Sequence, residues 1–179
     1  MNRSRRGDVC LSESGISLDV TAIGILEAWY DTGRMADTTS MNRAEAFVRL
    51  KVFGPKYSAR RLLLRWGGNF AFDAVSPDGK TVALISTSAA RTAGGNLATG
   101  KIKKLIADAL FLIFAARVKR RVMVFTERSM FAEFRKYQEA GRFPPGIELI
   151  HFPLPRSHRE RVRDARLVSR RELGGSDLT

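Results

Sequence analysis

The segment from Arg61 to Ser86 constrains the fold most strongly, because it predicts three consecutive β-strands joined by two short turns. The sequence RLLLRW is followed by Gly67-Gly68-Asn69 and then by FAFDAV, which predicts a hairpin. The second turn is Pro77-Asp78-Gly79, where proline fixes φ and glycine accepts the positive φ that follows. The third strand, TVALIS, is apolar enough to lie centrally in a sheet.

Helices and strands alternate in the rest of the chain. A helix is predicted after Gly100, with its buried stripe at Ile102, Leu105, Ile106, Ala109, Leu110 and Ile113. A strand RVMVFT comes next, then a helix that Thr126 caps and Gly141 closes, and finally a strand IELIHF. Because a strand that returns after a crossover helix lies in the same sheet, the predicted class is α/β, a mixed sheet flanked by helices in the order α-β-β-β-α-β-α-β.

Two stretches precede the strands. Ser17 caps a predicted helix that runs to about Tyr30. In the second stretch, Asn42-Arg-Ala-Glu45 resembles a capping box and favours a helix. The same stretch also alternates, with Val48, Leu50 and Val52 apolar, so helix and strand both remain open there. Gly54-Pro55 ends the element in either case.

The chain is strongly basic, with 31 Lys and Arg against 18 Asp and Glu and a net charge of +13 over 179 residues. This imbalance favours partners made of phosphate, nucleic acid first and an anionic membrane surface second. Arginine-rich codon usage is the alternative explanation. A chain of this length is most simply one domain. We expect a flexible basic arm at residues 1–15, a single domain at 16–155 and an Arg-rich C-terminal helix or tail at 156–179.

Composition also limits the metal chemistry and the location. The single cysteine, Cys10, and the two histidines near the C-terminus argue against a disulfide framework and a zinc site. The basic N-terminus has no apolar stretch behind it, so no signal peptide is predicted. The longest apolar run, residues 109–116, is too short to span a bilayer. We therefore expect a cytoplasmic protein without a membrane partner.

Asp73 is the candidate for chemistry, because it follows an apolar residue near the end of the second predicted strand. This strand–turn–strand arrangement and the order α-β-β-β-α-β resemble the core of the restriction-endonuclease-like, or PD-(D/E)xK, nucleases, over about residues 17–152. In that superfamily the next strand carries Glu-x-Lys. Here the corresponding positions hold Ile85 and Thr87, so the resemblance implies a divergent site.

The resemblance implies roles for three residues. Asp73 would be the metal-binding carboxylate, and Glu27 would be the acidic residue that some members carry on the first helix. Lys101, at the start of the helix after the third strand, would replace the missing lysine. Since phosphodiester hydrolysis needs Mg²⁺ held by oxygen ligands, Asp73 and Glu27 would be its ligands in an active enzyme. The alternative for Asp73 is a structural carboxylate bonded to backbone amides.

Several cations are candidates for nucleic-acid binding. Lys101, Lys103 and Lys104 lie in the first turn of a predicted helix, where the macrodipole disfavours cations, so they indicate a polyanion site. A solvated first turn is the alternative. The remaining candidates are Arg91 in the loop before this helix, together with Arg117 and Arg120 after it.

Three functions are consistent with these features. We favour a DNA-binding protein on a restriction-endonuclease-like scaffold with a divergent nuclease site that need not be active. The second is an active Mg²⁺-dependent endonuclease that uses Asp73, Glu27 and Lys101. The third is a protein-interaction module whose basic tail binds an acidic partner. Because enzymes of this superfamily are often dimers, the resemblance also allows a homodimer.

Overall fold

The computed structural model describes residues 38–174. The predicted basic arm, the helix from Ser17 and Glu27 lie outside the described residues. The described elements run in the order α2 (Thr38–Phe53), β1 (Ser58–Leu63), β2 (Asn69–Val75), β3 (Thr81–Ser86), α3 (Thr99–Phe114), β4 (Arg120–Phe125), α4 (Arg128–Glu139), β5 (Ile147–His151) and α5 (Arg156–Gly174).

The five strands form one mixed sheet in the order β1-β2-β3-β4-β5. β1, β2 and β3 pair antiparallel, whereas β3, β4 and β5 pair parallel. The mixed α/β class predicted from the sequence is therefore confirmed. β3 lies in the centre, and Val82 to Ser86 are all buried, which explains why this strand is an almost continuous apolar run.

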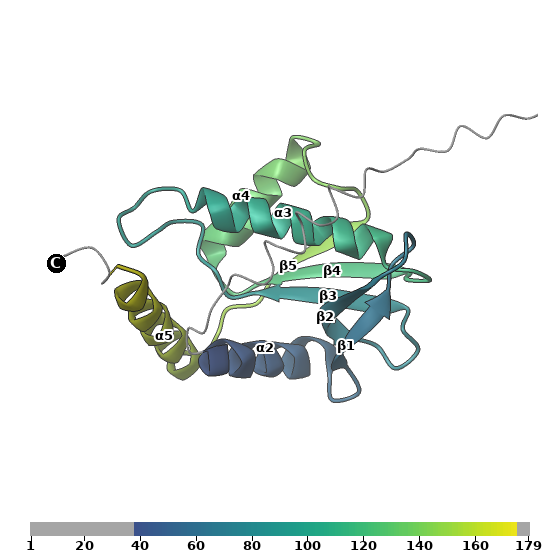
Figure 1. Cartoon of the computed structure of the whole chain (residues 1–179), viewed down its shortest axis with the longest axis horizontal. Helices are drawn as coiled ribbons and strands as arrows, with labels where there is room; N and C mark the ends of the chain where they lie inside the picture. Colours follow the sequence, from purple (N-terminus) through teal and green to yellow (C-terminus); the bar gives the residue numbers. More distant parts are fainter. Residues whose placement is uncertain (1–37, 175–179) are drawn as a thin grey trace, which may run out of the picture. The chain divides into compact units, whose positions relative to one another are not determined.

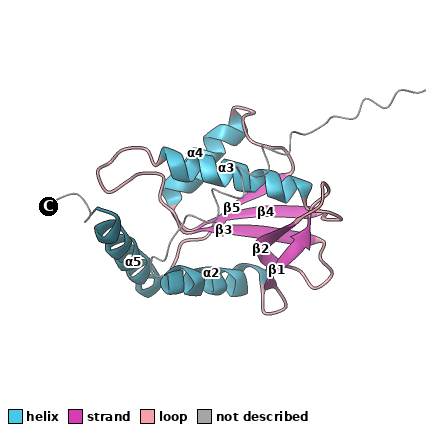
Figure 2. Ribbon diagram, viewed as in Figure 1, coloured by secondary structure: helices cyan, strands magenta, loops and turns pink. Residues whose placement is uncertain are grey.

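Helices cover both faces of the sheet, with α2 and α5 on one side and α3 and α4 on the other (Figure 1). The same view coloured by secondary structure shows the sheet between the two helical layers (Figure 2). Alternate side chains of β3 pack in two different cores. Val82 and Leu84 pack with α3 and α4. Ala83 and Ile85 pack with α2 and α5. The alternation along one strand thus supplies both layers.

The stretch that the sequence left open is the helix α2, and Asn42 and Glu45 lie inside it, so the predicted capping box is wrong. Ala44 and Val48 are fully buried at the i, i+4 spacing that places both on one helix face. α5 packs against α2, and the rings of Phe47 and His158 lie 4.4 Å apart between centroids. Gly54 ends α2 with a φ of 89°, and its amide donates to the Leu50 carbonyl at 3.0 Å.

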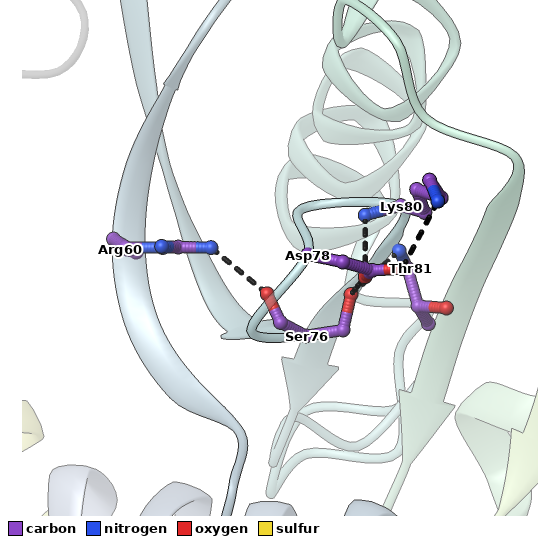
Figure 3. Close-up of polar contacts among 5 residues, drawn as sticks. All are labelled: Arg60, Ser76, Asp78, Lys80 and Thr81. Carbon is purple, nitrogen blue, oxygen red and sulfur yellow. Dashed lines mark hydrogen bonds and ion pairs between the residues drawn. The ribbon is translucent and has the colours of Figure 1, made fainter.

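The Pro-Asp-Gly turn between β2 and β3 forms as predicted. Asp78 accepts hydrogen bonds from the Ser76 hydroxyl at 2.6 Å and from the Lys80 amide at 3.0 Å (Figure 3). The Ser76 hydroxyl oxygen also accepts from the Thr81 amide at 2.9 Å. The hydrogen bond from Ser76, followed by the one from the Lys80 amide, lowers the pKa of Asp78. Gly79 has a φ of 70°, which is the conformation that the turn requires of it.

Three further local predictions were wrong. β1 ends at Leu63, because the Leu64 backbone bridges Ala115 and the Arg65 amide donates to the Phe114 carbonyl at the end of α3. Leu110 is 46% exposed, and Leu112 lies in the core instead, since the buried face of α3 is rotated relative to the predicted stripe.

The start of α4 also differs from the prediction. Its N-cap is Glu127 and no side chain caps it, so Thr126 does not have the predicted capping role. Gly141 closes this helix with a φ of 67°, as predicted. The C-terminal segment, left open between helix and tail, is the helix α5. None of the helices described at residues 38–174 is long and apolar enough to cross a membrane.

Candidate functional site

The antiparallel strands β2 and β3 stop pairing at Asp73. Their ladder consists of Ala74↔Ala83 and Val75↔Val82. On the other side of β2, Ser58 pairs with Val75 and Arg60 with Phe72, so Ala59 alone faces the two residues Asp73 and Ala74. This extra residue is a β-bulge, which re-aims a side chain and bends the strand.

The Asp73 carboxylate replaces the missing ladder bond. Its Oδ2 accepts from the Ile85 amide at 2.7 Å, so the amide remains satisfied where the strands part. Arg49 of α2 donates from Nη1 to the Asp73 carbonyl at 2.6 Å and fixes the same residue from the helix side. Asp73 therefore bonds to a backbone amide, which was the structural alternative to metal binding. This hydrogen bond occupies one of its carboxylate oxygens.

Burial raises the pKa of Asp73 to about 6, against the lowering effect of the Ile85 amide. The negative charge of Asp108 raises it further, while Lys104 and Arg49 lower it. A carboxyl group with this pKa takes up a proton as the pH falls through about 6 and is mostly ionised at neutral pH. The site thus has an excess of negative charge that Lys104 and Arg49 only partly offset.

Glu45 of α2 is the second carboxylate of the site. Burial raises its pKa to about 7, and the negative charge of Asp73 is the next largest cause. Arg49 and Lys104 lower the pKa of Glu45, as they do for Asp73. Glu45 and Arg49 are four residues apart, so they lie on the same face of the helix.

Asp108 of α3 is the third carboxylate, and it is only 5% exposed. Its Oδ2 lies 2.7 Å from Lys104 Nζ in an i, i+4 ion pair within α3. Glu45 and Asp108 belong to helices on opposite faces of the sheet, yet both interact electrostatically with Asp73. We call Glu45, Asp73, Asp108, Arg49 and Lys104 the carboxylate site.

The structure distributes the predicted site residues over different places. Asp73 is in the carboxylate site, and the lysine whose charge acts on it is Lys104. Desolvation, followed by the charge of Arg166 on α5, lowers the pKa of Lys101. Ile85 is buried in the core and contributes its backbone amide, and Thr87 is buried after the end of β3.

The remaining predicted cations lie elsewhere. Lys103 is exposed in the first turn of α3. Arg91 donates to the Gly95 carbonyl at 2.8 Å within the loop before α3. Arg117 is exposed, with a φ of 61°. Arg120 donates two hydrogen bonds to Glu148 at the amino end of β4. Because β3 and β4 are parallel and Ile85 lies near the carboxyl end of β3, this ion pair is at the opposite end of the strands from the site.

Three residues of the site, Glu45, Arg49 and Asp108, were not selected from the sequence. Asp108 carries a detectable signal, because it is an acidic residue within the apolar face of α3 and four residues after Lys104. Glu45 was interpreted only as part of a capping box. Its role depends on α2 lying against β2, which local spacing does not specify. The acidic residue on a helix was instead expected at Glu27, outside the described residues.

The oxygen donors of the site meet the needs of Mg²⁺ only in part. Within residues 38–174, no three His, Cys, Asp or Glu side chains form a group that could hold a metal ion. Asp108 is paired with Lys104, and one oxygen of Asp73 is bonded to Ile85. Mg²⁺ in phosphoryl-transfer sites is commonly held by one or two carboxylates together with substrate phosphates. Glu45 and Asp73 therefore fit Mg²⁺ only when a phosphate supplies further oxygen ligands.

No protein-family model, curated protein or solved structure matches the chain. The interpretation of the site therefore depends on its own residues. These are two carboxyl groups with raised pKa values, a buried aspartate in an ion pair, and two cations at the point where two strands part. Such a combination can bind a cation, a proton or, through Lys104 and Arg49, an anionic group.

Proposed function

We propose that this chain is a DNA-binding protein on a restriction-endonuclease-like scaffold with a divergent nuclease site. The observation that carries the proposal is the carboxylate site, in which the charges of Asp73 and Lys104 act on Glu45 and Asp73 lies at the end of the β2–β3 ladder. The order of α2, three antiparallel strands, α3 and a parallel strand supports the same scaffold. Ile85 in place of a metal-binding glutamate makes the site divergent.

Charge supports a nucleic-acid partner. The net charge of +13 belongs to a chain in which several Lys and Arg side chains on α3 and α5 are exposed. Phosphate contacts from such side chains provide affinity that does not depend on sequence, and they release counterions. We therefore expect binding that weakens steeply with salt.

Mg²⁺-dependent cleavage is the second candidate function. It is favoured by the excess negative charge at Glu45 and Asp73, which a divalent cation would neutralise. Bound there with a phosphodiester, Mg²⁺ would polarise the scissile phosphate. Lys104 would then stay near the same group and stabilise its charge.

The test uses the full chain with a labelled duplex and with a single strand of the same sequence. Affinity is measured from about 50 to about 200 mM salt, where a footprint of about four phosphates loses roughly a hundredfold in affinity. Plasmid and single-strand cleavage are assayed in parallel with Mg²⁺ and with Mn²⁺. Asp73→Asn and Lys104→Gln probe the site, and Lys136→Gln on α4 removes an exposed charge elsewhere.

The outcomes separate the candidates. Salt-sensitive binding without cleavage supports a binding protein. Cleavage that Asp73→Asn and Lys104→Gln abolish, but Lys136→Gln does not, establishes the nuclease instead. Failure to bind either nucleic acid at low salt would reject both and leave a protein-interaction module with an acidic partner.

A further inference from the structure

An aromatic cluster that reaches the surface joins the turn between β1 and β2 to the end of α3. The ring centroids of Trp66 and Phe114 lie 4.2 Å apart, and those of Trp66 and Phe111 lie 6.1 Å apart. Phe111 in turn stacks on Phe70, with centroids 4.1 Å apart and an angle of 10° between the rings. The Arg65 amide donates to the Phe114 carbonyl at 2.8 Å, so the turn and the helix are also joined through the backbone. The indole of Trp66 is therefore held against α3.

The outer side of this cluster is exposed. Trp66 is 46% exposed and Phe114 is 36% exposed. Leu110, four residues before Phe114 and on the same face of α3, is 46% exposed. We call Trp66, Phe114 and Leu110 the aromatic patch. Apolar patches that polar residues surround on a protein surface are typical of interaction sites.

The surroundings of the aromatic patch are positively charged. The segments that build it, residues 58–72 and 109–122, contain Lys and Arg but no Asp or Glu. Arg65, next to Trp66 in the chain, is exposed. Arg121 donates to a carbonyl in the last turn of α3 at 2.8 Å and to one just after the helix at 3.0 Å, which fixes its charge at that end. A complementary partner therefore carries negative charge beside rings or apolar groups.

Arg117, three residues after Phe114, has an uncommon backbone conformation. Within residues 38–174, it is the non-glycine residue with a positive φ, at 61°. Glycine adopts this φ freely, whereas a residue with a Cβ adopts it at a cost. Arg117 is exposed, so burial of its side chain does not offset that cost. Backbone strain of this kind is typical of residues that contact a ligand.

We propose that Trp66 is a stacking platform for an unpaired base of single-stranded nucleic acid, whose adjoining phosphates contact Arg65 and Arg117. The proposal rests on the DNA-binding function proposed above and names the form of nucleic acid that this surface takes. Every base has a π face, so stacking on an indole tolerates any sequence, and cations beside the ring attract the backbone. The bases of a duplex stack on one another and must be unstacked to reach Trp66, so the patch should favour single strands.

Two other partners fit this surface less well. A second copy of the chain would bring the same cations face to face, because a symmetric dimer uses the same patch on both subunits. A helix that binds a membrane surface inserts its main apolar face into the bilayer. That face of α3 is already buried in the core, at Ile102, Ala109 and Leu112. A single strand, in contrast, needs only an exposed ring with cations nearby.

The experiment follows the fluorescence of Trp66 in the full chain. The sequence has two tryptophans, so Trp29→Phe leaves Trp66 as the only one. A single-stranded DNA of about ten nucleotides, within the usual range of site sizes, should quench this fluorescence because a base stacks on the indole. An abasic strand of the same length carries the same phosphates without the bases. It should bind more weakly and leave most of the fluorescence.

Variants of Trp66 separate stacking from charge. Trp66→Ala should weaken single-strand binding about tenfold and change duplex binding little. Trp66→Phe keeps an aromatic ring and should retain most of the affinity. Leu50→Ala is the matched control for loss of exposed apolar surface, because Leu50 is 50% exposed on α2, on the other side of the sheet. Binding is measured by the anisotropy of labelled strands, and thermal unfolding checks that each variant is folded.

Arg117→Gly should change stability and binding in opposite directions. Glycine adopts the positive φ without a steric cost, so the thermal midpoint should rise. Single-strand binding should weaken, because one cation beside the patch is lost. Arg117→Gln keeps the Cβ, so it should weaken binding without raising the midpoint. If Arg117→Gly bound the single strand like the native chain, Arg117 would have no part in the platform.

The outcomes distinguish this proposal from the DNA-binding function. If Trp66→Ala binds the single strand like the native chain, or if the abasic strand binds equally well, the platform is wrong while DNA binding stands. If a single-stranded RNA quenches Trp66 but neither form of DNA binds, the platform stands and the DNA-binding function fails. Trp66→Ala could instead abolish binding to vesicles of anionic lipid, or convert a dimer into a monomer in sedimentation, without changing oligonucleotide binding. The partner would then be a membrane or a second copy, and the proposal would be overturned.

Discussion

The carboxylate site predicts an unusual dependence of stability on pH, which Glu45→Gln isolates. Burial and the charge of Asp73 raise the pKa of Glu45 from its ordinary 4.5 to about 7 in the folded chain. The folded state therefore binds the proton more tightly than the unfolded state does. The extra stability that this protonation gives the folded state is fully present below the ordinary pKa of 4.5, and it is lost as the pH rises through about 7.

The magnitude follows from the two pKa values. Each tenfold difference in proton affinity corresponds to about 1.4 kcal/mol, so Glu45 alone should reduce the free energy of unfolding by about 3 kcal/mol between about pH 4 and pH 8. Gln keeps the shape of the side chain and cannot ionise. Glu45→Gln should therefore be close to the native chain in stability at pH 4 and more stable by about 3 kcal/mol at pH 8.

Urea unfolding followed by circular dichroism across this pH range measures the difference. Glu139→Gln, at an exposed glutamate of α4, controls for the loss of one negative charge. If the stability of Glu45→Gln fell with pH as steeply as that of the native chain, Glu45 would not be the buried, protonated group described here. An equal stabilisation by Glu139→Gln would show that the gain does not come from the burial of Glu45.

Three further predictions concern the strands and turns. Asp73→Asn keeps an acceptor for the Ile85 amide and should stay folded, whereas Asp73→Ala should lower the free energy of unfolding by about 1–3 kcal/mol in urea titrations; equal stabilities would contradict the backbone role. Asp78→Ala should lower the thermal midpoint at neutral pH, and the difference should shrink as the pH falls below 3.8, because hydrogen bonds lower the pKa of Asp78 and stabilise its charged form. A difference that persists in acid would speak against this cause. Gly79→Ala should lower the free energy of unfolding by about 1–2 kcal/mol in urea titrations, because Gly79 has a positive φ. Gly100→Ala has open space around the added Cβ and should raise the free energy of unfolding by about 0.4–1 kcal/mol in the same titrations. If Gly79→Ala were the more stable of the two variants, this reasoning would be refuted.

The strands and turns of the sheet could be predicted because their determinants are adjacent in the chain. Alternation and the Pro-Asp-Gly turn specified β2 and β3 almost to the residue. The end of β1 could not be predicted, since Leu64 and Arg65 bond to the distant end of α3. The choice between helix and strand for residues 42–53 was likewise made by packing on the sheet and on α5.

The site was predictable only in its centre. Asp73 could be selected because it interrupts an apolar strand, but its partners come from α2 and α3 on opposite faces of the sheet. Their electrostatic effect on Asp73 depends on how α2 and α3 pack on the sheet, which has no signal in local spacing. For the same reason the sequence favoured Lys101, the first lysine of α3, over Lys104, one turn further on.

The packing of α5 on α2 has a consequence for how the protein is made. α2 is an early element of the described chain, but α5, which covers part of it, is synthesised only after the whole sheet. Val48 and Phe47 therefore stay partly uncovered on the ribosome until Val162 and His158 have emerged. Arg166 arrives in the same step, so its ion pair with Glu127 cannot form before α5 docks. An incomplete chain would thus contain most of the sheet without this ion pair.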